Sequence, residues 1–563
     1  MSAFQVSAGV QVKEIDLTNV VPAVSTSIGA LVGDFSAGPI GEVTTVSSET
    51  DMVAKFGQPT TANFTPFFQA AAFLKYGNSL RIVRAAKALQ VNATGSGTGL
   101  LIKNLSHYED NFKAGEASVG IWGARAAGTI GNGIKVEVCP ASDAAWAVWT
   151  GSAARYDKEF DSKPTSSDYA VARGGSLDEM HIIVIDTLGT ISGTPGNVLE
   201  KFAYVSAASD AKKTDGTSNY YIEVIASTSE YIYWLDHTTA VDAGTTSITD
   251  FTAGSTTEVT TLNGGVEGSA ATAGELSIAL DLFADAETVD INLLIAPVDV
   301  NGVTTLGAKV ITLVEGRKDC VAFISPPIAD TVNAATPATN VLEYFNALAS
   351  TSYSVADSTA VKIYDKYNDL YRWIPANGHT AGLCAYTDGV ADAWFSPAGF
   401  NRGQILNTVK IAYNPTKAER DDLYKARVNP IVSFPGEGTI LYGDKTMLAR
   451  PSAFDRINVR RLFIVLEKAV ATASKFQLFE LNDEFTRAQF RNMVEPFLRD
   501  IKGRRGLTDF KVVCDSTNNT GQVIDSNNFV ADIYIKPARA INYITLNFIA
   551  TRTGVEFSEI AGQ

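Results

Sequence analysis

The chain has 563 residues, 45% of them hydrophobic and 19% charged, and its formal net charge at pH 7 is -15. Its length corresponds to about three or four domains of roughly 100–200 residues each, and its apolar content excludes global disorder. The acidic balance argues against nonspecific binding of nucleic acid by the whole surface, because the protein and the phosphate groups would repel each other.

The N-terminal part of the chain is predicted to be a short arm followed by an α/β unit. Val10 and Val12 alternate with polar residues, which favours a short strand, although the first residues of a chain are often frayed. A Gly-Pro turn divides residues 28–46 into two predicted strands. Helices are then expected over residues 48–57 and 63–76, and a strand is expected over residues 80–85.

The composition changes after residue 89. Up to about residue 263 the chain is rich in Gly, Ser, Thr and Ala and has little helical periodicity. Short strands are predicted over residues 134–138, 181–186 and 220–226. We therefore expect residues 89–263 to form a mostly β outer insertion that lies outside the main fold.

The α/β pattern returns after the insertion. A helix is predicted over residues 276–284, a buried strand over 291–297, a helix over 310–316 and a buried strand over 320–327. Strand–helix–strand alternation implies parallel strands joined by right-handed crossovers. Residues 26–88 plus 264–360 are therefore expected to be the two halves of one middle α/β domain, which the insertion interrupts.

The remaining residues, 361–563, are expected to form an inner α/β domain. Helices are predicted from residues 404–406 onward and over 417–425, 459–474 and 483–501, and strands over 439–442, 510–513, 530–535 and 541–548. The last strand has no obvious partner within its own domain, and an unpaired strand invites the sheet edge of a neighbouring chain. The expected fold class is a mixed, multidomain α+β protein, and its closing strand favours assembly over catalysis.

The sequence contains no residue pattern that is typical of an active site or metal site. The His residues lack metal-binding spacing: His107, His181, His237 and His379. The Cys residues form no Cys-x-x-Cys pair and are predicted to be buried free thiols: Cys139, Cys320, Cys384 and Cys514. Residues 95–99 are rich in Gly but lack the Lys-Ser/Thr of a P-loop, which indicates a flexible linker. We therefore expect no catalytic residue, metal site, cofactor or enzymatic activity.

Two groups of basic residues stand out against the acidic background. The first comprises Arg456, Arg460 and Arg461, and the second comprises Arg499, Lys502, Arg504 and Arg505. The second group ends the helix predicted over residues 483–501, where the helix dipole alone favours positive charge by about 0.3–1 kcal/mol. The alternative interpretation is a basic patch that faces an acidic partner.

The chain also lacks the usual targeting segments. Its first residues do not show the basic and apolar regions of a signal peptide, and no apolar run approaches the ~20 residues of a membrane span. We expect a protein that is made and used in a cytoplasm, or released by lysis, without membrane insertion.

Several motifs are similar to those of one protein family. The opening AGVQVKEID resembles a Pro-Gly-Val-x-x-x-Glu start, with Ala8 in place of the Pro. Further similar motifs are FGQP, FLKYGNSLRIVRA, GTIGNGIKVEV, LNGGVEG, RKDCVAFISPP, YDKYNDLYRWIPANGHTAGLCAYTD, WFSPAGFNRGQI, LYGDKT, FDRINVRRLF, LFELNDEFTR and INYITLNF. On these motifs the chain resembles the tail sheath proteins of contractile-tailed bacteriophages, closest to the T-even type. The resemblance is densest over residues 361–563 and weak between residues 89 and 120.

The resemblance implies a homo-oligomer of stacked, commonly hexameric rings that contracts around a rigid tail tube. In this family each subunit lends its terminal strands to neighbours and so completes a small sheet there. Carried over to this chain, residues 1–25 are an arm that joins the inner domain, and strands 5–14 and 541–548 are donated to the receiving strands 510–513 and 530–535. The exchanging residues are then Val10, Val12, Glu14, Ile544, Leu546 and Phe548.

The resemblance also implies partners and a location. The helix over residues 483–501 and its basic end, Arg499, Lys502, Arg504 and Arg505, would face the tail tube protein. Further expected partners are other copies of the chain and the baseplate and tail terminator proteins, with no direct contact to nucleic acid. The subunit would belong to the virion tail and be assembled in the cytoplasm of the host bacterium.

Two alternatives stay open at this point. One is the sheath of a related contractile injection machine, of the tailocin or secretion type, in which the inner domain does the same work. The other is a β-rich surface enzyme or adhesin with its site in residues 89–263, which the lack of a signal peptide and of catalytic spacing disfavours.

Overall fold

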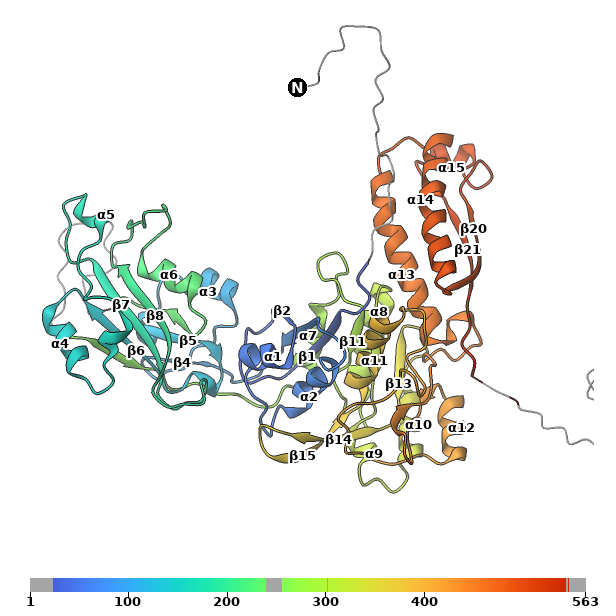
Figure 1. Ribbon diagram of the computed structural model, residues 1–563, viewed down its shortest axis with the longest axis horizontal. Helices are drawn as coiled ribbons and strands as arrows, with labels where there is room; N and C mark the ends of the chain where they lie inside the picture. The colour runs from blue at the N-terminus through green and yellow to red at the C-terminus, as the bar shows by residue number, and fades with distance from the viewer. Residues whose placement is uncertain (1–23, 239–255, 301, 543–544, 546–563) are drawn as a thin grey trace, which may run out of the picture. The chain divides into compact units, whose positions relative to one another are not determined.

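Figure 1 shows the computed structural model, which describes residues 24–238, 256–300, 302–542 and Thr545. The chain divides into two compact units. The large unit comprises the described part of Ala23–Ala393 together with Pro397–Lys468, and the small unit comprises Trp394–Ser396 and the described residues from Ala469 onward. Helices occur together with parallel and antiparallel sheets, so the chain is a mixed α+β multidomain protein, as predicted.

A seven-stranded sheet forms the centre of the large unit. Its order is β17 (Val428–Asn429), β13 (Ser354–Asp357), β12 (Val321–Ile324), β11 (Leu293–Ile295), β1 (Gly29–Gly33), β3 (Leu80–Arg84) and β2 (Val43–Val46). All neighbours pair in parallel except β2, which runs antiparallel to β3 at one edge. The predicted parallel pairing is therefore confirmed, and strands from both flanks of residues 89–263 lie side by side.

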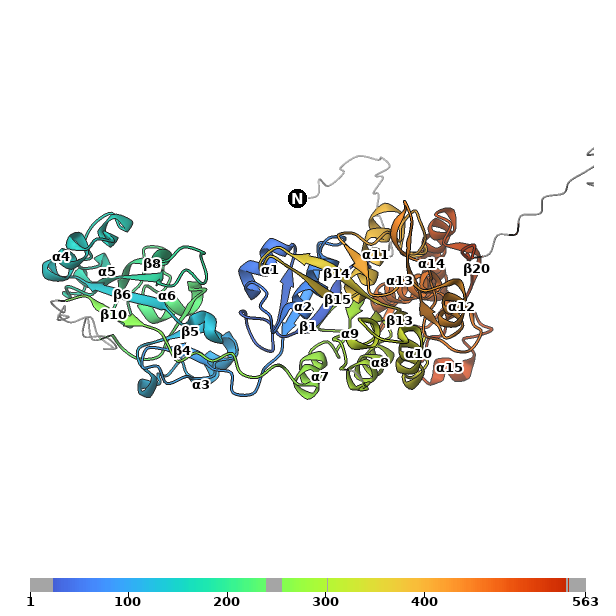
Figure 2. The same cartoon turned by 90° about the horizontal axis from the view of Figure 1, so that it is seen from below.

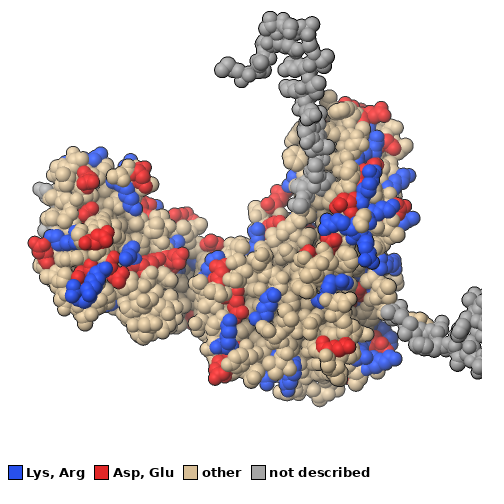
Figure 3. Space-filling view, in the orientation of Figure 1, with Lys and Arg blue, Asp and Glu red and all other residues tan. Residues whose placement is uncertain are grey.

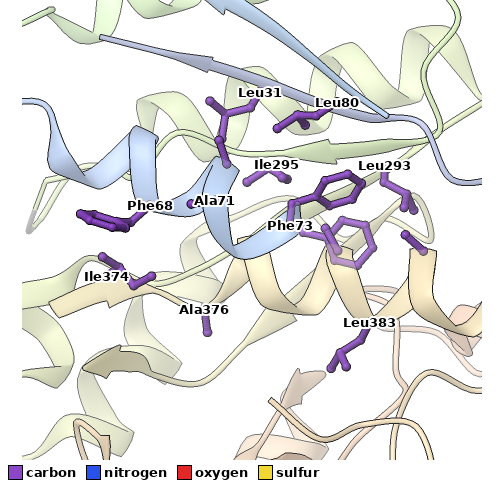
Figure 4. Packing of buried hydrophobic residues seen from close by; sticks show 14 of the residues in the cluster. Leu31, Phe68, Ala71, Phe73, Leu80, Leu293, Ile295, Ile374, Ala376 and Leu383 are labelled. Carbon is purple, nitrogen blue, oxygen red and sulfur yellow. The ribbon is translucent and has the colours of Figure 1, made fainter. Parts of the chain in front are cut away.

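Successive residues of these strands point to opposite faces, and both faces are covered, which is why the strands are apolar throughout. On β1, Leu31 joins one buried cluster, whereas Ala30 and Val32 join another. Figure 4 shows Phe73 beside Leu293 in the first cluster. Figure 2 shows the covering helices on the two sides of the sheet: α2 (Phe64–Phe73) and α11 (Asn377–Val390) on the first face, and α7 (Ala273–Asp281), α8 (Thr305–Arg317) and α10 (Pro337–Ala347) on the second.

Residues 361–393 and 397–468 also belong to the large unit. β14 (Ala360–Asp365) and β15 (Leu370–Pro375) form a hairpin, and Val361, Ile363 and Ile374 join the cluster on the first face. The expected inner domain, 361–563, is thus shared between the two units, and the division falls inside α13 (Ile457–Ser474). The remaining elements of this unit outside the insertion are α1 (Glu49–Phe56), α9 (Ile328–Thr331), β16 (Lys410–Ile411), α12 (Lys417–Lys425), β18 (Ile431–Phe434) and β19 (Gly438–Leu441).

The prediction of a helix from residues 404–406 onward is wrong. Gln404 forms a bridge with Ile440, and the amide of Ile405 donates to the carbonyl of Thr439 at 2.9 Å. Pairing with β19 satisfies the backbone polar groups here, so the segment has no need of helical hydrogen bonds. α12, in contrast, has its predicted bounds, because a capping box at Thr416 fixes its start.

The insertion contains two antiparallel sheets. The first has the order β10 (Glu258–Thr261), β6 (Ile134–Pro140), β7 (Glu179–Asp186) and β8 (Asn197–Ser206), and the second has the order β4 (Asn92–Thr94), β5 (Trp122–Ala127) and β9 (Ile232–Trp234). Four α-helices accompany them among the described residues: α3 (Leu105–Asn111), α4 (Asp143–Gly151), α5 (Asp168–Val171) and α6 (Tyr221–Thr228). Helices are therefore more frequent in this segment than its composition predicted.

The strand that was expected over residues 220–226 is α6 instead. Tyr221, Ile222, Ile225 and Ala226 are buried, and their spacing places them on one side of a helix. The apolar run is short, and such a run cannot be assigned to strand or helix from periodicity alone. Packing of this side into the core of the insertion decides in favour of the helix.

The two ends of the insertion are joined by direct contacts. The side chain of Asn132 donates to the carbonyl of Gly265 at 3.0 Å and accepts from its amide at 2.9 Å. A Cβ on Gly265 would lie 2.4 Å from the carbonyl oxygen of Gly128, so this close approach requires glycine. Nearby, the buried Arg84 guanidinium donates to the carbonyl of Ala127 at 2.7 Å. The motifs GTIGNG and LNGG thus close the insertion onto the central sheet.

The small unit is a helical hairpin that carries a small sheet. The end of α13 is followed by α14 (Glu484–Gly503), which begins where Asp483 Oδ1 accepts the amide of Thr486 at 2.8 Å as its N-cap. β20 (Leu507–Val513) pairs antiparallel with β21 (Asp532–Pro537), and α15 (Gly521–Asp525) lies between them in the chain. This sheet packs against α14.

Candidate assembly surfaces

The first candidate surface is the edge of the β20–β21 sheet. In the part of the chain that the structure describes, no third strand joins these two. A two-stranded sheet is marginal by itself, and its outer edges present backbone groups that another strand can pair with. The outer edges of this sheet are therefore a candidate site at which strands from other chains, or from other parts of this chain, can pair.

The two faces of this sheet differ in character. Phe510 pairs with Ile535 and Val512 pairs with Ile533 on the face that turns toward α14. On the opposite face Lys511, Tyr534 and Lys536 are exposed. Strand alternation places apolar residues inward and polar residues outward, so an added strand would need the same alternation to continue both faces.

The second candidate surface is the basic end of α14. The helix brings Arg499, Lys502, Arg504 and Arg505 together, and all four are exposed. Lys502 Nζ lies 3.0 Å from Asp509 Oδ1 and lowers the pKa of that carboxyl group. Figure 3 shows Lys and Arg side chains gathered over the part of the small unit that carries β20 and β21.

Local contacts also hold this basic end. The guanidinium of Arg504 lies 5.0 Å from the ring centre of Trp394 and 3.6 Å from the carboxylate of Asp500. Trp394 Nε1 in turn donates to the carbonyl of Arg504 at 3.1 Å. These contacts fix the backbone at the helix end, while the exposed charges project from it.

The other basic group, Arg456, Arg460 and Arg461, does not form a surface patch, because these side chains contact partners in the large unit. Arg461 is 4% exposed and lies 2.6 Å from Asp388. Arg460 lies over the ring of Tyr353, and Arg456 pairs with a carboxylate of the large unit. The N-terminal half of α13 packs into the large unit, so these side chains are paired rather than presented to solvent.

The third candidate surface is the loop between α13 and α14, which sequence reasoning missed. The loop and the first turn of α14 together expose five large apolar side chains: Phe476, Leu478, Phe479, Leu481 and Phe485. Phe479 is fully exposed at a φ of 70°, a conformation that is a rare outlier for a bulky residue. Several large apolar side chains exposed so close together in the chain are typical of a site of interaction, and the run LFELNDEF was their sequence signal.

The residues expected to exchange strands lie outside the described residues. These are Val10, Val12 and Glu14 at one end and Ile544, Leu546 and Phe548 at the other. Ile541, the last large apolar residue described before the C-terminal end, is exposed.

Buried titratable side chains of the large unit have strongly shifted pKa values. His181 is buried, its Nε2 donates to the carbonyl oxygen of Ser162 at 2.8 Å, and its pKa falls to about 4 because burial disfavours the charged ring. Burial likewise raises the pKa of Cys320 to about 12. All four Cys are free and buried, as predicted. Within the described ranges no cluster of His, Cys, Asp or Glu could hold a metal ion, and no helix there is long and apolar enough to cross a bilayer.

An open sheet edge, an exposed apolar loop and a basic helix end define a protein that associates with other chains. Family models agree with this class. The phage tail sheath protein central domain matches residues 264–447, the phage tail sheath C-terminal domain matches residues 449–551, and the tail sheath protein Gp18 domain III N-terminal region matches residues 26–85.

Whole proteins give the same result. The tail sheath proteins of Vibrio phage KVP40 and Enterobacteria phage T4 are each 34% identical to this chain, over 99% of it and 99% of each relative. This chain belongs to the tail sheath proteins of contractile phages, which are structural proteins of the virion tail.

Two crystal structures share the fold. The sheath tail protein of Listeria innocua has a TM-score of 0.53 at 13% identity and covers 92% of this chain and 96% of its own length. The sheath tail protein of Desulfitobacterium hafniense has a TM-score of 0.51 at 12% identity and covers 94% of this chain and 100% of its own length.

Proposed function

We propose that this sheath subunit polymerises as stacked hexameric rings around a tail tube and contracts by rearranging the contacts between subunits. The observation that carries the proposal is the two-stranded β20–β21 sheet, in a chain that belongs to the sheath family. Contraction then drives the tube through the host envelope. Its driving force is apolar surface that neighbouring subunits bury on contraction, summed over many identical subunits.

The links between rings are exchanged strands in this proposal. The arm over residues 1–25 donates Val10, Val12 and Glu14, and the C-terminal strand donates Ile544, Leu546 and Phe548. Both join β20 and β21 of other subunits and continue their alternation. Each backbone hydrogen bond contributes about 0.5–1.5 kcal/mol net, so a strand with several bonds contributes a few kcal/mol. Rings that are linked through exchanged strands can rotate without separating.

The proposal also assigns positions in the assembly. The insertion, 89–263, lies outermost, residues 26–88 with 264–360 lie in the middle, and the residues from 361 onward with the arm lie innermost. The partners are further copies of the chain, the tail tube protein, and the baseplate and tail terminator proteins. Assembly takes place in the host bacterial cytoplasm, without nucleic-acid binding, membrane insertion or catalysis.

Truncation of either arm tests the strand exchange. A chain without residues 2–16, or without the residues after Ala540, should remain a folded monomer that forms no tubes, because the receiving sheet then lacks its added strands. Electron microscopy measures tube formation, and circular dichroism with thermal unfolding checks the fold.

A matched variant distinguishes the effect of arm length on tube formation from the effect of strand pairing. A full-length chain in which Val10 and Val12 are both changed to Pro keeps the length but cannot donate those ladder hydrogen bonds. Tubes of normal length from either truncation, or from this variant, would refute strand exchange.

A second candidate function is the sheath of a related contractile injection machine, of the tailocin or secretion type. The two sheath structures that share the fold come from bacterial genera, which keeps this candidate open. Negative-stain microscopy of particles from producing cells distinguishes the two, because a phage sheath sits below a DNA-filled head. Discrete monomers with hydrolase activity would instead support the β-rich enzyme.

A further inference from the structure

The large unit contains an apolar pocket between α2 and the β14–β15 hairpin. Its volume is about 440 Å³, within the ~300–1,000 Å³ range of binding pockets. Its walls are apolar and come from Phe68, Ala72, Ile363, Ile374 and Val409. We call it the hairpin pocket. Val409 is 57% exposed at its mouth, so the apolar wall continues to the surface.

The mouth of the hairpin pocket is basic. Lys75 and Lys366 both line it, and their ammonium groups share one carboxylate, that of Glu49, at 3.8 Å and 3.2 Å. Two lysines against one glutamate leave a net positive charge. An occupant with an apolar body and a negative rim would complement this mouth.

The exposed surface of α7 has an apolar body and a negative rim of this kind. Ile278 is 71% exposed and Leu282, four residues later, is 39% exposed, so the two side chains lie on the same side of the helix. Asp281 and Asp285 flank them and are exposed. We call this surface the α7 ridge. Asp281 pairs with Lys309 at 2.6 Å, which leaves Asp285 and the nearby Glu287 as the negative rim.

The pocket and the ridge lie on opposite faces of the central sheet. Figure 2 shows α2 and the β14–β15 hairpin on one side and α7 on the other. Both surfaces belong to the large unit, so one subunit presents them to two different neighbours. A contact of this head-to-tail kind does not close into a dimer and instead generates rings or helices.

We propose that the α7 ridge of one subunit seats in the hairpin pocket of a neighbouring subunit. This contact deepens the proposed function and rests on it, because it assigns a second link between subunits besides the exchanged strands. Its occupant is another copy of this chain, chosen by the match of an apolar ridge with a negative rim to an apolar pocket with a positive mouth.

Crosslinking of the full chain tests the contact. In the double variant Ile278→Cys/Val409→Cys each subunit carries one thiol on the ridge and one at the pocket mouth. A short bis-maleimide reagent adds one thiol at each end, and the four native thiols are buried and do not compete. Tubes of this variant should give a ladder of covalent dimers, trimers and longer species on denaturing gels. Each single variant should give dimers at most.

The control is Val171→Cys/Val409→Cys, in which the first thiol lies on another helix at an aliphatic residue that is also exposed. If tubes form and the ridge–pocket variant gives no ladder above this control, the contact is refuted while the proposed function stands. If the unaltered chain forms no tubes, the proposed function itself fails.

A charge placed on the ridge gives an independent measurement. Ile278→Asp should lower the yield of tubes by about tenfold or more, since an aspartate cannot enter an apolar pocket without loss of its hydration. Val171→Asp should leave the yield unchanged. Equal yields from the two variants would overturn the contact. Thermal unfolding of the monomers shows that both fold.

Discussion

Asp357 ends β13 with a carboxyl group that is completely buried. The hydroxyl of Ser325 donates to its Oδ2 at 2.5 Å, and Ser325 in turn accepts the amide of Asn377 at 2.9 Å. Burial raises the pKa of Asp357 from 3.8 to about 8, because a charge inside the protein loses its hydration. The side chain is thus a neutral link between the central sheet and α11 at neutral pH.

This shift predicts how stability depends on pH. The pKa of Asp357 is higher in the folded state than in the unfolded state, so the folded state binds the proton more tightly. Its contribution is fully present below pH 3.8 and is lost as the pH rises through about 8. Denaturant unfolding of the monomer between pH 5 and pH 9 should therefore show falling stability, and Asp357→Asn should flatten that slope.

A surface carboxylate provides the comparison. Asp285→Asn should keep the slope of the unaltered chain above pH 5, because the pKa of this exposed group is lowered by hydrogen bonds to Glu287 and Thr288. A slope that Asp357→Asn leaves unchanged would contradict the assignment, whatever the variant does to stability at a single pH.

At the scale of elements, the packing of α11 on α2 depends on a glycine. A Cβ on Gly378 would lie 2.3 Å from the carbonyl oxygen of Gln69, which is backbone that cannot rotate away. Gly378→Ala should therefore lower the free energy of unfolding by about 1–3 kcal/mol, as overpacking does in other cores. Denaturant unfolding of the monomer measures the change.

The same helix supplies a matched control. A Cβ on Gly389 would meet nothing within 4 Å, so Gly389→Ala should raise the free energy of unfolding by up to about 1 kcal/mol through helix propensity alone. If both variants lost a similar amount of unfolding free energy, the close approach of α11 to α2 would not be the reason why residue 378 must be glycine.

Elements with strong local signals were predicted well. α12 begins at a capping box and α14 at the Asp483 cap, and both lie where the sequence placed them. The segments that failed had weak signals. Tyr221–Thr228 forms a helix because the apolar side of that helix packs into the core of the insertion. Gln404 instead pairs with Ile440 of β19, a strand that lies beside it in the fold. In both cases a contact distant in the chain decided between two local possibilities.

At the scale of the whole molecule, the proposed contact with the tube is electrostatic and weak enough to release. The double variant Arg504→Glu/Arg505→Glu should reduce assembly on tail tubes more than polymerisation of the sheath alone, because exposed ion pairs contribute only about 0–1 kcal/mol each but add over many subunits. Cosedimentation with and without purified tubes measures the two activities.

Lys212→Glu/Lys213→Glu makes the same charge change at adjacent exposed residues of the insertion, and both activities should persist. Equal loss of both activities in the Arg504/Arg505 variant would count against the tube contact. Raising the salt concentration should reproduce the loss of tube binding in the unaltered chain, since salt screens exposed charges.

The sequence by itself determined the α/β alternation, the parallel order of the central strands, the buried free thiols and, through its motifs, the sheath family. These properties follow from local periodicity and composition. Only the tertiary structure decided which charges are buried. Arg461 meets Asp388, 73 residues away, whereas Arg505 stays exposed. It also placed residues 361–393 and 397–468 in the unit that contains the central sheet, and it set the α7 ridge on the opposite side of that sheet from the hairpin pocket. Periodicity gives each element an apolar side, but the partner of that side depends on long-range packing, which no local pattern encodes.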